Sequence, residues 1–257
     1  MIRIASLDPA PIAELRYLNA RSGGGTEVSR LEVLRAHVGP LADELDAIVC
    51  TSDLQGMANG ELLGVAVAEL LLELAERGEL PRAARTGIVL AGDLYSVPAA
   101  NKRGGYGDVA TVWQAFASGF PWVVGVAGNH DDVSTVRELG DHVHLLDGET
   151  VVVDGLRFGG VGGIIGNPRK PGRRDEGEQL SRISQVLDEA CDVLVLHEGP
   201  HGDEDQPGNA EIRELIDAAE LPFAICGHAH WADTLATRAA GQTLNVDARV
   251  VVLVGSA

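Results

Sequence analysis

Short apolar runs alternate along the chain with longer stretches in which apolar residues recur at spacings of three and four. The runs predict buried β-strands, and the longer stretches predict helices that bury one side. The strands are expected at residues 47–50, 86–91, 122–127, 192–196 and 223–226. The helices are expected at residues 29–46, 61–77, 109–118, 178–190 and 209–219.

Two further segments predict antiparallel strands. Residues 149–162 contain two short apolar stretches joined by Asp154-Gly155, a typical hairpin turn. Residues 243–254 predict another strand pair, with Asp247 near its turn. Strands that alternate with helices, together with these hairpins, favour a mixed α/β fold with two sheets over a simple doubly wound sheet. The 257 residues are expected to form a single domain.

Polar residues follow the predicted strands, and in open α/β sheets the loops beyond the carboxyl ends of the strands form sites. Taken singly, most such residues are turn or capping residues. Together they combine carboxylate, amide and imidazole groups, a mixture that suits Mn, Fe, Zn or Co more than Ca. Two ions about 3.5–4 Å apart, joined by one carboxylate, can clamp a phosphoryl group. The residues are Asp53, Asp93, Asn129, His130, Asp131, His197, His228 and His230.

These residues occur in ordered motifs that resemble those of the calcineurin-like metallophosphoesterase family, in order and in interval. The motifs are Ser52-Asp53-Leu54-Gln55-Gly56, Gly92-Asp93, Gly128-Asn129-His130-Asp131, His197 and Gly227-His228-Ala229-His230. The resemblance implies a four-layer αββα sandwich with two mixed β-sheets. It also implies a metal-dependent phosphoric ester hydrolase with two divalent metal ions.

The resemblance also assigns a role to each residue. Asp53, Asp93 and His230 would hold the first metal with Gln55 beside them, and Asp93 would bridge to the second metal. Asn129, His197 and His228 would complete the second site. The nucleophile would be a metal-bridging hydroxide. His130 would be the general acid for the leaving oxygen, and Asp131 would orient it.

Two departures from the family pattern stand out. The first motif is usually Asp-x-His, whereas this chain has Gln55, whose amide is a neutral and weaker ligand. The first site is therefore expected to bind metal less tightly and to prefer Mn or Mg, as in the Asp-x-Gln motif of the similar manganese-dependent ADP-ribose/CDP-alcohol diphosphatase branch. Gln55 either coordinates, directly or through water, or points to solvent. Residues 1–46 form an added strand and helix that covers an edge, extends the substrate wall or builds a dimer contact.

The formal net charge of −18 argues against a general nucleic-acid-binding surface, because phosphate contacts require clustered Lys and Arg. Two loops are nevertheless basic. Lys102 and Arg103 in one, and residues 169–174 in the other, either bind an anionic substrate or are solvated loop charges. His201 lies four residues after His197 and is the additional histidine that could reach a substrate.

The cysteines and the hydrophobicity profile concern the cellular setting. Cys50, Cys191 and Cys226 are isolated beside apolar runs, which predicts buried free thiols instead of disulfides. The N-terminus has no apolar core typical of a signal peptide, and no stretch is apolar enough to span a bilayer. A cytoplasmic protein without a membrane partner is expected, and its oligomeric state is left open.

The expected function is hydrolysis of a phosphodiester or nucleoside-diphosphate-type small molecule, with Mn favoured and Fe, Zn, Co or Mg as alternatives. A small substrate is preferred over a phosphoprotein because the chain lacks the extra length of the large protein phosphatases. One alternative is a non-catalytic scaffold with the same fold, although such a protein would be expected to lose more ligands than this chain has. The other is a nuclease acting on short nucleic acid.

Overall fold

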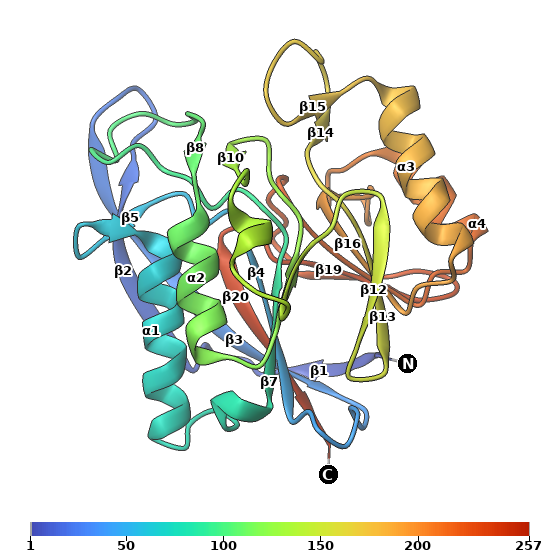
Figure 1. Ribbon diagram of the computed structural model, residues 1–257, viewed down its shortest axis with the longest axis horizontal. Helices are drawn as coiled ribbons and strands as arrows, with labels where there is room; N and C mark the ends of the chain where they lie inside the picture. Colours follow the sequence, from blue (N-terminus) through green and yellow to red (C-terminus); the bar gives the residue numbers. More distant parts are fainter. Residues whose placement is uncertain (1, 257) are drawn as a thin grey trace.

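Two mixed β-sheets form the centre of the protein, and helices cover their outer faces (Figure 1). The computed structural model describes residues 2–256. The larger sheet has ten strands in the order β11-β9-β7-β4-β20-β3-β2-β5-β6, with β1 paired to β3. These strands are β1 (Ile4–Leu7), β2 (Ala13–Ala20), β3 (Thr26–Val38), β4 (Ala47–Ser52), β5 (Met57–Ala58), β6 (Glu61–Leu62), β7 (Thr86–Leu90), β9 (Val123–Gly125), β11 (Val143–Leu145) and β20 (Arg249–Gly255).

The second sheet has six strands in the order β12-β13-β16-β17-β19-β18. They are β12 (Glu149–Val153), β13 (Leu156–Val161), β16 (Val193–Glu198), β17 (Phe223–Gly227), β18 (Leu235–Thr237) and β19 (Gln242–Asn245). The predicted hairpin at residues 149–162 is confirmed, because β12 and β13 pair antiparallel. Two small parallel pairs complete the strands. They join β8 (Gly107–Asp108) to β10 (Asp131–Asp132), and β14 (Ile164–Ile165) to β15 (Arg173–Arg174).

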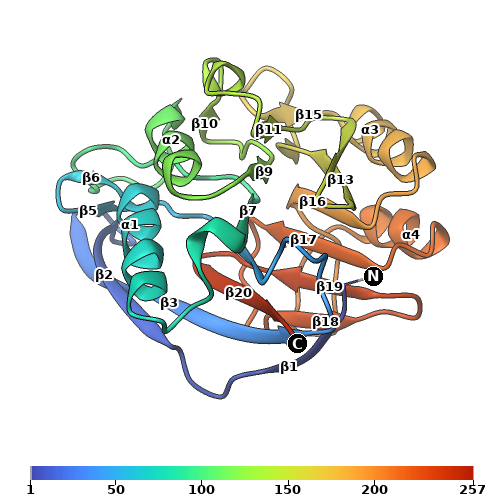
Figure 2. The ribbon, with the colours of Figure 1, turned by 60° about the horizontal axis from the view of Figure 1, so that its bottom comes forward.

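The helices lie on opposite sides of the two sheets, as Figure 2 shows. Helices α1 (Leu63–Glu76) and α2 (Ala110–Gly119) pack against the larger sheet, and α3 (Glu176–Asp188) and α4 (Ala210–Ala218) pack against the six-stranded sheet. Asp175 and Asn209 cap the last two by accepting from the amides of Glu178 and Ile212. Short 3-10 turns are η1 (Ala83–Arg85) and η2 (Val136–Glu138). The four predicted helices after residue 60 and the mixed α/β fold are confirmed.

Apolar side chains from both sheets meet between them. Ile48, Val89 and Val251 from the larger sheet share one buried cluster with Phe158 and Phe223 from the six-stranded sheet. The strands β4, β7 and β9 are mutually parallel, and so are β13, β16 and β17. The carboxyl ends of each parallel set therefore lie at one edge of their sheet, where the site residues follow.

The predicted helix at residues 29–46 is wrong, because residues 26–38 form the long strand β3. Leu31 and Val33 face the cluster beneath α1 and α2, whereas Leu34 and Val38 face the space between the sheets. Since the strand buries both faces, its apolar residues occur on both alternating sets of positions. The spacing from Leu31 to Leu34 to Val38 therefore imitates a helix.

The N-terminal extension is thus a set of strands. β2 and β3 form a hairpin whose tip contains Gly23, Gly24 and Gly25, all with positive φ. In the pairing of β3 with β20, Val33 is opposite Val250, so the earlier residues of β3 project beyond the start of β20. The same end of β20 pairs with the carboxyl end of β4. The hairpin therefore rises past the edge at which β4 ends, beside the loop that precedes β8 (Figure 1).

The predicted strand pair at residues 243–254 is also wrong. β19 belongs to the six-stranded sheet and β20 to the larger one, where it lies between β3 and β4. The chain crosses from one sheet to the other through residues 246–248. Consecutive strands are frequently partners, but here β19 pairs with β17 and β18, and β20 pairs with β3 and β4.

The predicted free thiols are confirmed, since Cys50, Cys191 and Cys226 are buried and unpaired with one another. Among residues 2–256, no helix is long and apolar enough to cross a membrane.

Candidate metal centre

The backbone turns sharply at the polar residues that follow the strands. Asp53, Asp93 and His228 have φ of 52°, 54° and 67°, in the left-handed region that side chains other than glycine seldom adopt. Such strained positions cluster at functional sites. The loops also approach closely, because a Cβ atom at Gly128 would collide with the backbone nitrogen of Asp93. Glycine at this position lets the loops that carry Asp93 and Asn129 touch.

One group of side chains forms a compact ligand set. Ligand atoms of Asp93, His197 and His228 all lie within 4.8 Å of one another. Asn129 Oδ1 and His197 Nε2 are buried and have no hydrogen-bond partner within the described part of the chain. Buried polar atoms are almost always paired, so these two require another partner. His197 Nδ1 lies 2.8 Å from the Ala91 carbonyl oxygen and donates to it, so Nε2, which lies 3.4 Å from Asp93 Oδ1, is the nitrogen that could bind a metal once it is deprotonated. The donor set of Asp93, Asn129, His197 and His228 fits a divalent ion.

The residues expected at the other metal already have partners in the protein. Asp53 Oδ2 accepts from the Ser52 hydroxyl at 2.7 Å and from the His228 amide at 2.9 Å. Gln55 Nε2 donates to Asp93 Oδ2 at 2.9 Å, so the Gln55 side chain faces the centre and not the solvent. Gln55 therefore does not point to solvent, and its coordination of a metal stays a prediction.

His230 lies at the rim, and its imidazole side chain is 64% exposed. Its Nδ1 is 2.8 Å from Asp247 Oδ2, and its Nε2 is 3.4 Å from Arg249 Nη2. Sequence reasoning treated Asp247 only as a turn residue and gave Arg249 no role. Both reach the centre because Arg249 pairs with Ser52 between β20 and β4. No local pattern in the sequence could have indicated this long-range pairing.

The charges of the centre are strongly coupled. Burial by itself lowers the pKa of His197, but Asp93 and Asp53 outweigh burial and raise this pKa to about 10. Burial and the neighbouring His197 lower the pKa of His228 to about 4. Burial raises the pKa of Asp53, whereas the two adjacent histidines, against the effect of burial, hold the pKa of Asp93 below its usual range. Without metal, the centre therefore keeps a proton on His197 beside the Asp93 carboxylate.

His130 borders this cluster. Its Nε2 lies 3.9 Å from Asp93 Oδ2, its Nδ1 donates to the Gly105 carbonyl, and its ring is 24% exposed. The backbone amide of His130 also donates to Asp93 Oδ1 at 2.9 Å. This imidazole is therefore fixed at the edge of the centre, with one nitrogen turned toward it.

The expected contact between Asp131 and the His130 ring is replaced by a different arrangement. The Asp131 carboxylate accepts from the amides of Leu94, Tyr95 and Gly128 at 2.8, 3.1 and 2.8 Å. Both carboxylate oxygens thus accept backbone amides, and in the described part of the chain no hydrogen bond joins them to the His130 ring. Asp131 thus joins two ligand-bearing loops, and Gly105 is the residue that orients His130.

The first basic loop lies beside the centre. Lys102 and Arg103 line a small recess together with Gln55, Asn19 and Ala20. Arg103 Nε donates to the Ala20 carbonyl at 3.2 Å, so the β2–β3 hairpin supports this loop. The role of residues 1–46 as an extension of the substrate wall stays a prediction.

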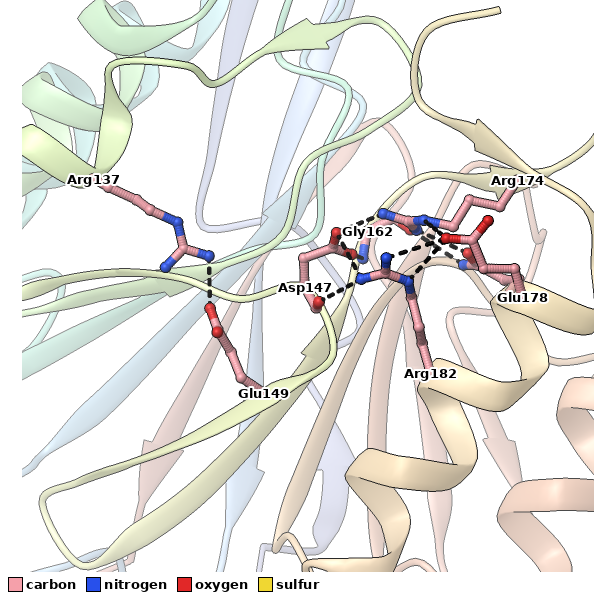
Figure 3. A network of polar contacts seen from close by, with 8 residues as sticks. Arg137, Asp147, Glu149, Gly162, Arg174, Glu178 and Arg182 are labelled. Carbon is pink, nitrogen blue, oxygen red and sulfur yellow. Dashed lines mark hydrogen bonds and ion pairs between the residues drawn. The ribbon is translucent and has the colours of Figure 1, made fainter. Parts of the chain in front are cut away.

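Two of the arginines in the second basic loop, Arg173 and Arg174, have different surroundings. Arg174 is tied by Nη1 to the Gly162 carbonyl and to Gln179, and by Nη2 to Asp147 (Figure 3). It is therefore a structural residue. Arg173 is instead one of the charges that, after burial and His197, lower the pKa of His228.

His201 is outside the ligand cluster, and its contact with a substrate stays a prediction. Its side chain is exposed, and its backbone carbonyl accepts from Arg213 Nη1 at 3.0 Å. Within residues 2–256, the ligand cluster comprises Asp93, His197 and His228 without it.

A cluster of imidazole, carboxylate and amide groups at the carboxyl ends of strands from both sheets places the protein among α/β proteins with a set of side chains that can hold a divalent metal. Comparison with family models identifies the particular family. Residues 47–232 match the model described as calcineurin-like phosphoesterase, and the chain belongs to this family of metal-dependent phosphoesterases. The resemblance inferred from the motifs is confirmed. The family implies divalent metal ions.

No curated protein matches the chain. Among solved structures, TT1561 of Thermus thermophilus is 16% identical, with a TM-score of 0.54 over 78% of this chain and 88% of that one. A second structure is 12% identical, with a TM-score of 0.52 over 78% and 90%. GAP50, the anchor in the inner membrane complex of Plasmodium, is 12% identical, with a TM-score of 0.47 over 78% and 71%. The first two show a shared fold.

Proposed function

We propose that the protein hydrolyses a phosphodiester or a nucleoside-diphosphate-type small molecule with the help of divalent metal ions. The observation that carries this proposal is the pair of buried, unpartnered ligand atoms, Asn129 Oδ1 and His197 Nε2, beside Asp93 and His228. Divalent ions bound there would supply an activated water and would neutralise charge on the phosphoryl oxygens.

The proposed ligands form two unequal sites that share Asp93. The tighter site contains Asn129, His197 and His228, whose ligand atoms are gathered. The weaker site contains Asp53, Gln55 and His230, where an amide replaces the usual imidazole. Mn is favoured for this mixture, with Fe, Zn, Co or Mg as alternatives.

His130 is proposed as the general acid. Its Nδ1 proton is held by the Gly105 carbonyl, so Nε2 is the nitrogen that delivers a second proton toward the centre. An imidazole at this position can protonate the leaving oxygen as the bond to phosphorus breaks. Asp131 contributes by fixing the loop, without a contact to the ring.

Two basic residues beside Gln55 would favour a small anionic substrate. Lys102 and Arg103 line the recess there, and both lie in a protein that is otherwise strongly acidic. A guanidinium group can bind phosphate oxygens in bidentate geometry. These two residues would therefore hold the part of the substrate beyond the scissile phosphate, such as a second phosphate group.

The test is hydrolysis of bis-p-nitrophenyl phosphate and of ADP-ribose by the purified protein with added Mn. Asp93→Asn is expected to abolish turnover, whereas the matched variant Asp132→Asn, changed outside the ligand set, should retain it. Unchanged turnover in Asp93→Asn would refute the metal mechanism. A panel of monoesters, cyclic nucleotides, diesters, diphosphates and oligonucleotides, each with Mn, Mg, Zn and Co, would then define the substrate class.

A further inference from the structure

The two ring nitrogens of His230 are both engaged by side chains outside the family motifs. Nδ1 donates to Asp247 at 2.8 Å, and the Arg249 guanidinium lies 3.4 Å from Nε2 through Nη2. The same Nη2 donates to the Trp231 carbonyl at 2.9 Å, and the Arg249 carbonyl accepts from the Thr51 hydroxyl. Arg249 is therefore anchored from both its backbone and its side chain next to the proposed weaker site.

This arrangement contrasts with that at the tighter site. Asn129 Oδ1 makes no hydrogen bond in the described chain, and His197 Nε2 has the Asp93 carboxylate, itself a proposed ligand, 3.4 Å away, so an ion can reach both atoms without displacing a side chain from outside the ligand set. At His230, Nδ1 already donates a hydrogen bond to Asp247. A metal would therefore need the lone pair of Nε2. An ion at this position must displace a cationic guanidinium and is also repelled by it.

We propose that Arg249 is an internal occupant of the weaker metal site. It holds His230 Nε2 while only the tighter site contains an ion, and it leaves when a phosphate group of the substrate draws the guanidinium away. Guanidinium groups bind phosphate oxygens more strongly than they bind a neutral imidazole. Loading of the second ion is thereby coupled to binding of the anion, and such coupling is reciprocal. The inference rests on the proposed function for the identity of the sites.

The first experiment titrates the metal-free protein with Mn in the absence of substrate. The wild-type protein is expected to bind one equivalent tightly and a second weakly. In Arg249→Gln, the affinity for the second Mn ion should rise by at least about tenfold, because a competing hydrogen bond and a like charge are both removed. Arg249→Met, which keeps an extended apolar stem, guards against loss of folding in the glutamine variant.

Arg30→Gln is the matched control. Arg30 lies in the same sheet, is exposed and pairs with Glu14, so its removal should leave both equivalents of Mn unchanged. An unaltered second equivalent in folded Arg249→Gln and Arg249→Met would overturn the proposal. Because the titration contains no substrate, absence of hydrolysis would refute the proposed function without affecting this result.

The second experiment adds inorganic phosphate to the same titrations. Phosphate should raise the affinity for the second Mn ion by a larger factor in the wild-type protein than in Arg249→Gln. Only in the wild-type protein does phosphate draw a guanidinium away from His230. Equal factors in the two proteins would overturn the coupling between Arg249 and the anion.

Discussion

Asp131 connects the two loops that carry Asp93 and Asn129. Its buried carboxylate accepts three backbone amides, from Leu94, Tyr95 and Gly128. Asp131→Ala leaves these donors without partners, and we expect a loss of about 3 kcal/mol in the free energy of unfolding. Binding of Mn at the tighter site should weaken at the same time, because the relative position of its ligands is no longer fixed.

Chemical denaturation and Mn titration of the variant check this expectation. Asp132→Ala is the matched control, since the adjacent carboxylate accepts only the Ser134 amide and is less buried. Equal stability of Asp131→Ala and Asp132→Ala would show that the carboxylate does not hold the loops together.

Protonation of His197 makes metal binding depend on pH. Its pKa in the metal-free protein is about 10, above the ordinary 6.5, so the imidazole carries a proton at neutral pH. A metal ligand must be deprotonated, and binding therefore releases about one proton. The apparent affinity for Mn should rise roughly tenfold per pH unit between about pH 6.5 and about pH 8.5.

The sign for folding is the opposite. A histidine whose pKa is raised by folding contributes stability below pH 6.5, and this contribution is lost as the pH rises toward 10. Calorimetric titration of the tighter site in buffers of different ionisation enthalpy measures the released proton. An affinity for Mn that is independent of pH would contradict the protonated state of His197.

At the scale of the elements, the sequence predicts those whose pattern is local. Helices such as α3 and α4 bury one side and expose the other, so their periodicity is unambiguous. β3 buries both faces over its second half, and this removes the alternation that identifies a strand. The ligands that directly follow short buried strands were also predictable, because the apolar run and the polar residue after it form a local pattern. Arg249 was not, because it depends on pairing with Ser52 almost the length of the chain away.

The β2–β3 hairpin is expected to set the affinity for substrate without affecting the metals. Replacing residues 19–27 with a short turn removes Ala20, whose carbonyl supports Arg103 at the recess. Leu31 and Val33 remain in the core beneath α1, so the sheet should fold and bind Mn as before. KM should rise by roughly tenfold, the effect of losing one well-placed charged contact.

Steady-state kinetics and Mn titration of this shortened variant separate the two effects. A control that shortens only residues 22–25 keeps Ala20 and should preserve KM. If both deletions leave KM unchanged, the hairpin does not form part of the substrate wall.

At the scale of the whole molecule, the centre joins the two sheets. Asp93 and Asn129 follow strands of the larger sheet, whereas His197 and His228 come from β16 and β17 of the other. The sheets approach so closely that a Cβ atom at Gly227 would collide with the Asp53 carboxylate. The family motifs made this gathering of ligands predictable. The pairing of β3 with β20 was not predictable, because it depends on packing between segments that are distant in the sequence.

A metal bound by ligands from both sheets should therefore stabilise the fold against unfolding. At a free concentration one hundred times Kd, binding contributes about 2.7 kcal/mol, because the unfolded chain does not assemble the site. For a chain of this size, this corresponds to a rise of roughly 5–10 °C in the melting temperature. Differential scanning calorimetry with Mn, and again after EDTA, measures the difference. Asp93→Asn should show little or no shift with Mn, and a shift as large as that of the wild-type protein would place the stabilising ion elsewhere.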